Sequence, residues 1–238
     1  MKVLIVVDVQ NDFCPGGALA VTEGDKVVPV INKLMASSEY DLIVLSQDFH
    51  PSNHVSFADN HANGKLFDSI HTRHGNQILW PRHCVQGTPG CEFRSDLQIN
   101  LADFIVQKGM NPEIDSYSAF FDNAQLKDTG LRDYLICQAI NRGEGLADIE
   151  VNVCGLALDY CVKDTAIDSS VLGMKTKVIL DACRAVDQTP QRGMEIIREL
   201  QTYQVESALC KDIIKARPRD RGDFCSREND LHERGIER

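Results

Sequence analysis

The sequence lacks a long apolar segment and an excess of basic residues. No apolar run approaches the roughly 20 residues that a membrane-spanning helix needs, so a membrane protein is not expected. The formal net charge is −10, from 25 basic and 35 acidic residues. This balance disfavours nucleic acid or an anionic membrane surface as a partner. A small molecule remains the expected partner.

Regularly paired cysteines are also missing, and a leader segment is not expected. The nine cysteines are an odd number, and their spacing makes no paired zinc-binding motif. Reduced thiols are therefore expected rather than disulfides. The apolar start meets an acid at Asp8, too early for a secretory signal peptide, and we expect a cytoplasmic protein. The sequence leaves the oligomeric state open, a homo-oligomer included.

What the sequence does contain is an alternation of short β-rich apolar runs with helical stretches, which is typical of βαβ units. Continuous apolar runs, as at residues 3–7, suit strands covered on both faces. We predict an α/β three-layer sandwich with a mostly parallel, doubly wound sheet of about six strands. Strands are expected at residues 2–8, 41–46, 102–107, 149–154, 175–180 and 204–209, and helices at 24–37, 130–142, 159–173 and 188–202.

The domain organisation predicted is one domain over residues 1–210 and a charged tail at 211–238. The tail could be disordered, form an exposed helix or pack on a neighbouring subunit. Within the domain, residues 47–101 show little periodicity but hold six of the seven histidines and the single tryptophan. A segment of that length without secondary structure usually carries function. It also leaves the second strand at its carboxyl end, where open α/β sheets bind ligands.

Cys161 is the candidate nucleophile, because it follows the apolar run 149–157 and opens a predicted helix. A helix N-terminus lowers the pKa of a thiol, and the backbone N–H groups of Ala157 and Cys161 would stabilise an oxyanion. A buried cysteine that packs as a small hydrophobe is the alternative interpretation. The neighbours favour the nucleophile: Asp8 ends the first strand as a candidate base, and Lys108 ends the third, where it would favour anionic forms.

Asp48 and His50 form the core of a candidate metal site. Alternate residues of an extended segment point the same way, and the distant His83 can complete a site with open positions. His54 is close enough to be an extra ligand or to support the others. Spacing alone leaves open that these are unrelated surface histidines, which is the interpretation kept for the remaining three of this segment, His61, His71 and His74.

These segments, in this order over residues 1–210, closely resemble the nicotinamidases of the isochorismatase-like cysteine hydrolase superfamily. The resemblance implies a catalytic triad of Asp8, Lys108 and Cys161. It implies metal ligation by Asp48, His50 and His83. It also implies that the substrate's pyridine ring lies between Phe13 and Trp80 and that the pocket includes Tyr117.

The activity implied by the resemblance is conversion of nicotinamide and water to nicotinate and ammonia through a thioester, as part of NAD salvage. The implied cofactor is one divalent metal ion. One carboxylate and two imidazoles suit Zn²⁺ best, although Mn²⁺ or Fe²⁺ would also fit. Superfamily members that act on isochorismate lack the cysteine, and those that cleave carbamoyl compounds generally lack the Asp/His/His group.

One position departs from the family pattern. Many relatives carry threonine where this chain has Leu158, which adjoins the peptide bond expected to be cis, between Ala157 and Leu158. The departure leaves the backbone oxyanion donor usable. Two alternatives stay open: another small-amide or carbamoyl cysteine hydrolase of the superfamily, and a non-catalytic metal-binding protein with a redox-sensing thiol.

Overall fold

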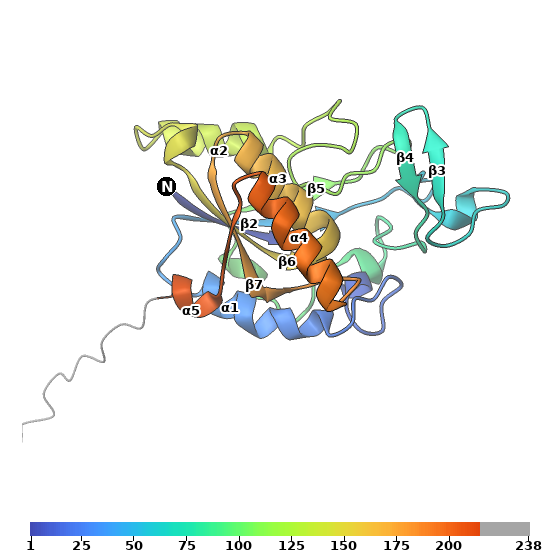
Figure 1. Ribbon diagram of the computed structural model, residues 1–238, viewed down its shortest axis with the longest axis horizontal. Coiled ribbons are helices and arrows are strands. Elements are labelled where there is room, and N and C mark those ends of the chain that lie inside the picture. Colours follow the sequence, from blue (N-terminus) through green and yellow to red (C-terminus); the bar gives the residue numbers. More distant parts are fainter. Residues whose placement is uncertain (215–238) are drawn as a thin grey trace, which may run out of the picture.

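The computed structural model describes residues 1–214, which form a six-stranded sheet flanked by helices (Figure 1). The strand order is β5-β2-β1-β6-β7-β8, and every neighbouring pair is parallel. The predicted α/β sandwich with a doubly wound parallel sheet is confirmed. The strands are β1 (Lys2–Val7), β2 (Leu42–Asp48), β5 (Phe104–Lys108), β6 (Glu150–Leu156), β7 (Lys175–Arg184) and β8 (Glu206–Ala208).

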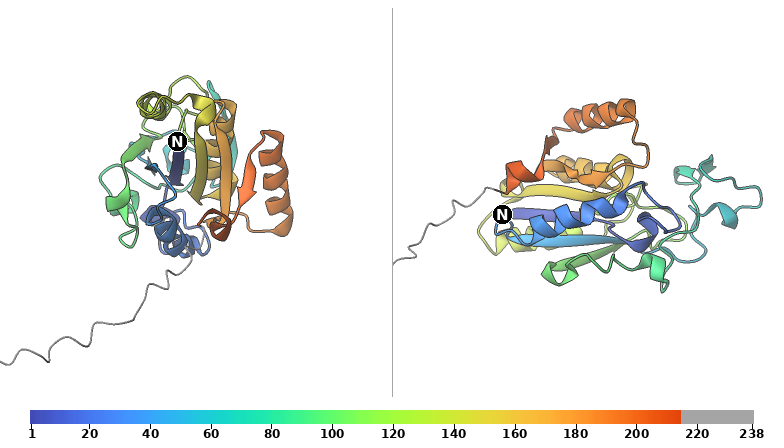
Figure 2. Two further views of the ribbon diagram at one scale, coloured as in Figure 1. Left: turned by 90° about the vertical axis from the view of Figure 1, so that its left-hand side faces the viewer. Right: turned by 90° about the horizontal axis from the view of Figure 1, so that it is seen from below.

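Helices cover both faces of this sheet, with α1 (Val28–Met35) on one face and α3 (Lys163–Val171) and α4 (Pro190–Thr202) on the other (Figure 2). The remaining helices are α2 (Leu131–Ile140) and α5 (Cys210–Ile213). Because β1 lies between two strands and between two helical layers, it has no solvent-facing side. Its residues from Val3 to Val7 are at most 1% exposed, which explains why the run is continuously apolar.

The segment between β2 and β5 is more ordered than its sequence suggests. A hairpin of β3 (Ser69–Thr72) and β4 (Gly75–Ile78) projects from the body (Figure 1). The same segment contains short 3₁₀ turns at Ala58–Asn60, Pro89–Cys91 and Ile99–Leu101. The prediction of a segment without secondary structure was wrong here. Each of these strands has only four residues of mixed polarity, too few to produce a recognisable alternation.

The predicted element boundaries mostly hold, with two differences. β7 continues to Arg184 because an irregularity in its pairing with β6 lets Gly155 and Leu156 find partners farther along the strand. α5 runs past the domain end predicted at residue 210, and the predicted tail beyond residue 214 lies outside the described residues. Within residues 1–214, no helix is long and apolar enough to cross a membrane. The eight cysteines of this range are free thiols, as expected.

Candidate active site

The predicted triad assembles at the carboxyl edge of the sheet. Asp8 follows β1, Lys108 ends β5, and Cys161 follows β6, so three strands bring together residues far apart in sequence. The Nζ of Lys108 lies 2.9 Å from Asp8 Oδ2 and 3.5 Å from Cys161 Sγ. All three residues are at most 6% exposed. β1 and β6 flank the point where the strand order reverses, which is where open α/β sheets bind ligands.

Lys108 also has hydrogen-bond partners outside the triad. Its Nζ donates to the backbone oxygen of Ser116 at 2.8 Å and to Asp48 Oδ1 at 2.5 Å. Burial opposes the ammonium form, but the carboxylates of Asp48 and Asp8 outweigh it and hold the pKa of Lys108 well above its ordinary value. The side chain is therefore a permanent cation beside the sulfur.

Asp8 has the character of a base that works near neutral pH. Burial raises its pKa to about 6, although Lys108 and the Ser46 hydroxyl, which donates to Oδ1 at 2.6 Å, favour the carboxylate. A carboxylate with a pKa near the working pH can accept a proton and return it within one catalytic cycle. Asp8 therefore suits the role predicted for it.

Cys161 differs from its prediction in two respects. It lies in a π-helical turn, Leu158–Val162, directly before α3, rather than opening the helix itself. Burial raises the pKa of its thiol well above the ordinary value; Lys108 lowers it, while Asp8 and Asp48 raise it further. The expectation of a lowered thiol pKa was wrong, because it considered the helix terminus and not the desolvation. The resting group is a thiol whose proton must be removed during the reaction.

The cis peptide bond of this turn also differs from expectation. It joins Leu156 to Ala157, one bond before the position predicted from the family pattern. The N–H of Ala157, one of the two predicted oxyanion donors, belongs to this bond. Leu158, the residue that departs from the family pattern, is outside it.

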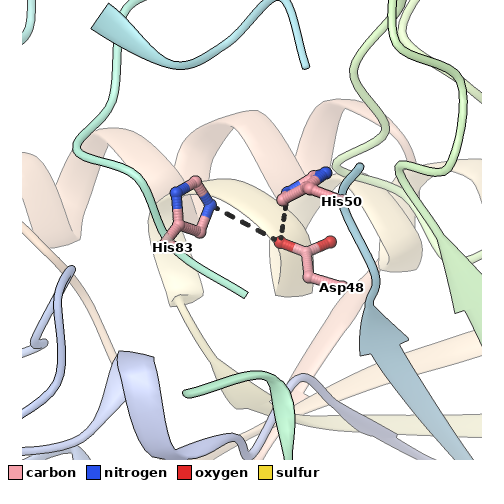
Figure 3. A group of neighbouring side chains, drawn as sticks. All are labelled: Asp48, His50 and His83. Atoms are coloured by element: carbon pink, nitrogen blue, oxygen red, sulfur yellow. Dashed lines mark ion pairs between the residues drawn. The ribbon is translucent and has the colours of Figure 1, made fainter. Parts of the chain in front are cut away.

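The three predicted metal ligands lie together in the structure (Figure 3). Asp48 Oδ2 lies 3.4 Å from His50 Nε2 and 3.9 Å from His83 Nε2. Ligand atoms at about 2.0–2.1 Å from a tetrahedral ion lie roughly 3.3 Å apart, so these separations suit a metal with small adjustments. The Nδ1 of His50 lies 2.8 Å from the oxygen of Gly109, and that of His83 lies 2.7 Å from the oxygen of Pro81.

These carbonyl contacts fix the rings so that each Nε2 faces the carboxylate, as metal-binding histidines require. Burial raises the pKa of Asp48, but Lys108 and His50 more than reverse this, and the net pKa is lowered. Burial lowers the pKa of His83 to about 4, so its Nε2 lone pair is free. One carboxylate and two imidazoles, buried and converging, fit a divalent ion.

His54 lies beside this group rather than in it. Its ring packs on that of His50 with centroids 4.2 Å apart, and its Nδ1 is 2.7 Å from the hydroxyl of Ser56. Its buried Nε2 has no hydrogen-bond partner within residues 1–214. His54, His50 and Asp115 have ligand atoms within 4.8 Å of one another, so His54 supports the site without reaching Asp48 and His83.

The other three histidines of the segment lie elsewhere. His61 Nε2 is 2.8 Å from the oxygen of Val55, while His71 and His74 belong to the projecting hairpin and its turn. Of the six histidines of residues 47–101, His50, His54 and His83 therefore lie together, and His61, His71 and His74 lie apart from them.

A pocket connects the nucleophile to the metal group. The three predicted substrate-binding residues, Phe13, Trp80 and Tyr117, line it together with Cys161. The indole N–H of Trp80 donates to the hydroxyl oxygen of Tyr117 at 3.2 Å, which fixes both rings. The candidate nucleophile, two of the candidate metal ligands, Asp48 and His83, and the three predicted substrate residues thus face one cavity.

Several site residues were not predicted. Tyr160 lines the pocket and meets the ring of Trp80 edge-on at 5.0 Å; its position beside Cys161 was the available signal. Asp115 is buried beside the histidines and accepts a hydrogen bond from Gln77. The amide of Gln10 bonds both the N–H and the carbonyl of Asp48, and nothing in the sequence indicates this role.

Comparison with known proteins decides the family. Residues 2–205 match the model of the isochorismatase domain. This chain belongs to the isochorismatase family. Its curated relatives in the family include the nicotinamidase of Acinetobacter baylyi, 47% identical over 184 residues, covering 77% of this chain and 81% of the relative. The nicotinamidase of Escherichia coli is 42% identical over 206 residues, covering 84% and 90%.

Solved structures of the isochorismatase family agree. A nicotinamidase/pyrazinamidase from Acinetobacter superposes with a TM-score of 0.80 at 42% identity, covering 89% of this chain and 97% of that one. The yeast nicotinamidase bound to the inhibitor nicotinaldehyde has a TM-score of 0.80 at 34% identity, covering 88% and 100%. The pyrazinamidase of Pyrococcus horikoshii in complex with zinc has a TM-score of 0.66 at 33% identity, covering 87% and 98%.

Proposed function

We propose that this protein is a nicotinamidase, an amide hydrolase that converts nicotinamide and water to nicotinate and ammonia. The observation that carries the proposal is the convergence of two groups on one aromatic pocket: the Asp8, Lys108 and Cys161 triad, and the metal-binding type of cluster at Asp48. The names of the curated relatives and the nicotinaldehyde held by the yeast structure support this substrate class.

Acylation follows from the positions of the triad. Asp8 accepts the thiol proton of Cys161 as the sulfur attacks the carboxamide carbon. The ammonium of Lys108, 3.5 Å from the sulfur, compensates for the negative charge that develops there. The N–H groups of Ala157 and Cys161 would donate to the oxyanion. Asp8 then gives its proton to the leaving nitrogen, ammonia departs, and the acyl group remains on Cys161 as a thioester.

Deacylation reverses these proton movements. Asp8, again a carboxylate, accepts a proton from the water that attacks the thioester carbon. The same backbone N–H groups face the second oxyanion. Collapse of this intermediate expels the sulfur, which regains a proton, and nicotinate is released. The pKa of about 6 suits Asp8 to both directions of transfer.

Asp48, His50 and His83 would hold the metal ion in this enzyme. When bound, the ion supplies a Lewis-acidic contact that orients the substrate's ring nitrogen. We propose Zn²⁺, in keeping with the ligand set and with the zinc in the Pyrococcus horikoshii structure, while Mn²⁺ and Fe²⁺ accept the same ligands. Phe13, Trp80 and Tyr117 provide apolar surface for the pyridine ring. We further propose that the reaction serves NAD salvage in the cytoplasm.

The direct test is incubation of the purified protein with nicotinamide, zinc and a reductant, while nicotinate and ammonia are quantified. We expect both products in equal amounts. Absence of turnover with each of Zn²⁺, Mn²⁺ and Fe²⁺ would contradict the proposal. Small ureido compounds in the same ammonia assay test the alternative of a carbamoyl hydrolase, which predicts faster release from those compounds than from nicotinamide.

Replacement of the nucleophile tests the mechanism. Cys161→Ser should abolish turnover while nicotinamide still binds, because a serine hydroxyl is far less acidic than a thiol and Asp8 cannot deprotonate it effectively. The matched control is Cys137→Ser, since Cys137 is an exposed thiol on α2. Steady-state turnover and equilibrium binding of nicotinamide are measured for both variants. Wild-type turnover by Cys161→Ser would show that another group is the nucleophile.

A further inference from the structure

Residues 185–188 follow β7 and have no role in the mechanism above, and one of them, Val186, lines the pocket. β7 pairs with β6 so that Arg184 lies opposite Leu156. The chain that leaves β7 therefore emerges beside the chain that leaves β6 for the nucleophile. As a result, Val186 lines the same pocket as Ala157 and Cys161.

Asp159 ties this segment to the nucleophile turn. Its carboxylate is 2% exposed and accepts two consecutive backbone N–H groups, from Val186 to Oδ1 and from Asp187 to Oδ2, both at 2.9 Å. Asp159 lies two residues before Cys161. One side chain thus fixes the distance between the turn that carries the sulfur and the backbone that carries Val186.

A second attachment lies two residues after Val186. The amide of Gln188 donates to the carbonyl of Thr22 at 2.7 Å. Thr22 follows Val21, which also lines the pocket. Residues 186–188 are therefore held by two side-chain attachments, and their backbone cannot move aside without breaking these hydrogen bonds.

Val186 is 41% exposed, whereas Ala157, Trp80 and Cys161, which line the same pocket, are at most 7% exposed. Its side chain therefore stands where the pocket meets solvent. Valine is branched at Cβ and has little rotamer freedom, so on an anchored backbone it acts as a rigid edge. A substituent on a bound ring that points toward this edge would collide with it.

We propose that Val186 is a specificity-determining residue that rejects ring-substituted amides, with Asp159 and Gln188 as positioning residues that hold it at the rim. This inference rests on the proposed function, because it concerns which relatives of nicotinamide the same site accepts. It assigns the rim, rather than the ring-stacking walls, as the place where substituents are rejected.

The test compares nicotinamide with nicotinamides that carry a single methyl group on the ring. Val186→Ala should raise kcat/KM for at least one methylated amide relative to nicotinamide by about tenfold, which is the lower range for one methyl group in an apolar pocket. The matched control is Val171→Ala, since Val171 is 68% exposed on α3 and does not line the pocket. Its ratios should equal those of the wild type.

Ratios for Val186→Ala that stay within about twofold of the wild type for every methylated isomer would overturn the inference. This failure is distinguishable from failure of the proposed function, because then the wild type would not hydrolyse nicotinamide itself. The two substrates are measured with the same preparation, so the ratio does not depend on the fraction of active enzyme.

The positioning residues are tested through the same ratio. In Asp159→Asn, one side-chain oxygen can still accept a backbone N–H, but the amide nitrogen faces the other N–H as a second donor. Gln188→Ala removes the hydrogen bond to the carbonyl of Thr22. Both should shift the ratio in the direction of Val186→Ala and should add little in combination with it. A lowered Tm with unchanged ratios in both variants would show a structural role only and would overturn the assignment of these two residues.

Discussion

At the scale of single residues, Lys108 connects the catalytic triad to the candidate metal ligands. Its Nζ contacts Asp8 of the triad and Asp48 of the metal group, so these carboxylates share one cation. His83 also faces Asp48, but it carries no charge, because burial lowers its pKa to about 4. Replacement of either Asp48 or His83 should therefore weaken metal binding, but only replacement of Asp48 should change the pKa of the Cys161 thiol.

Metal-free Asp48→Asn and His83→Ala variants test this difference. Both should lose zinc retention. Burial raises the pKa of Cys161, and the charge of Asp48 raises it further, so removing that charge should lower the thiol pKa and speed alkylation by iodoacetamide at neutral pH. The rate should rise about tenfold for each unit by which the pKa falls while the thiol remains mostly protonated. His83→Ala should alkylate like the metal-free wild type.

The measurement is the rate of Cys161 alkylation against pH in the three metal-free proteins. Equal profiles for Asp48→Asn and the wild type would show that the charge of Asp48 does not raise the pKa of the Cys161 thiol. A changed profile in His83→Ala would show that the imidazole itself acts on the thiol.

At the scale of elements, the end of β5 positions the metal site through a glycine. Gly109 follows Lys108 with a φ of +65°, and a Cβ built there would lie 2.3 Å from Cε1 and 2.5 Å from Nδ1 of His50. The carbonyl of Gly109 also fixes the ring of His50. Two consecutive residues at the end of β5 therefore serve both groups: Lys108 belongs to the triad, and Gly109 orients the metal ligand His50.

Gly109→Ala should weaken zinc binding by about 10- to 100-fold, because displaced metal-supporting contacts have costs of that size. Gly143→Ala is the matched control: its φ is +73°, but no atom lies within 4 Å of the added Cβ. Both variants pay about 1–2 kcal/mol for a left-handed alanine. Zinc affinity from chelator competition and urea unfolding are measured for both. Equal zinc affinities would contradict a specific contact with His50.

The sequence predicted those elements and site residues whose signals are local. Asp8 and Lys108 stand at the ends of apolar runs, so their place at the sheet edge follows from the strands. The roles of Gln10 and Asp159 could not be predicted, because each depends on backbone groups brought near by the fold. The raised pKa of Cys161 was missed for the same reason, since burial depends on the tertiary structure.

At the scale of the whole molecule, β8 forms one edge of the sheet, and α5 follows it. Both come after Val186, the last residue in the sequence that lines the pocket. β8 pairs with the start of β7, and Val205 and Cys210 are at most 5% exposed. Ile213 and Ile214 pack against the core. The site depends on this edge only indirectly, because β7 carries the rim segment at its carboxyl end.

Two truncated chains test how much of the sequence the site and its stability require. A chain of residues 1–214 keeps every contact described above, so we expect wild-type turnover and an unchanged Tm. A chain of residues 1–203 loses β8, α5 and the burial of Val205, which by itself costs about 2 kcal/mol. For a chain of this size that corresponds to a fall in Tm of at least about 4–8 °C.

Calorimetry and nicotinamide turnover are measured on both truncated chains. Loss of turnover in the 1–214 chain would mean that residues 215–238 contribute to the site, and the folded unit would extend beyond α5.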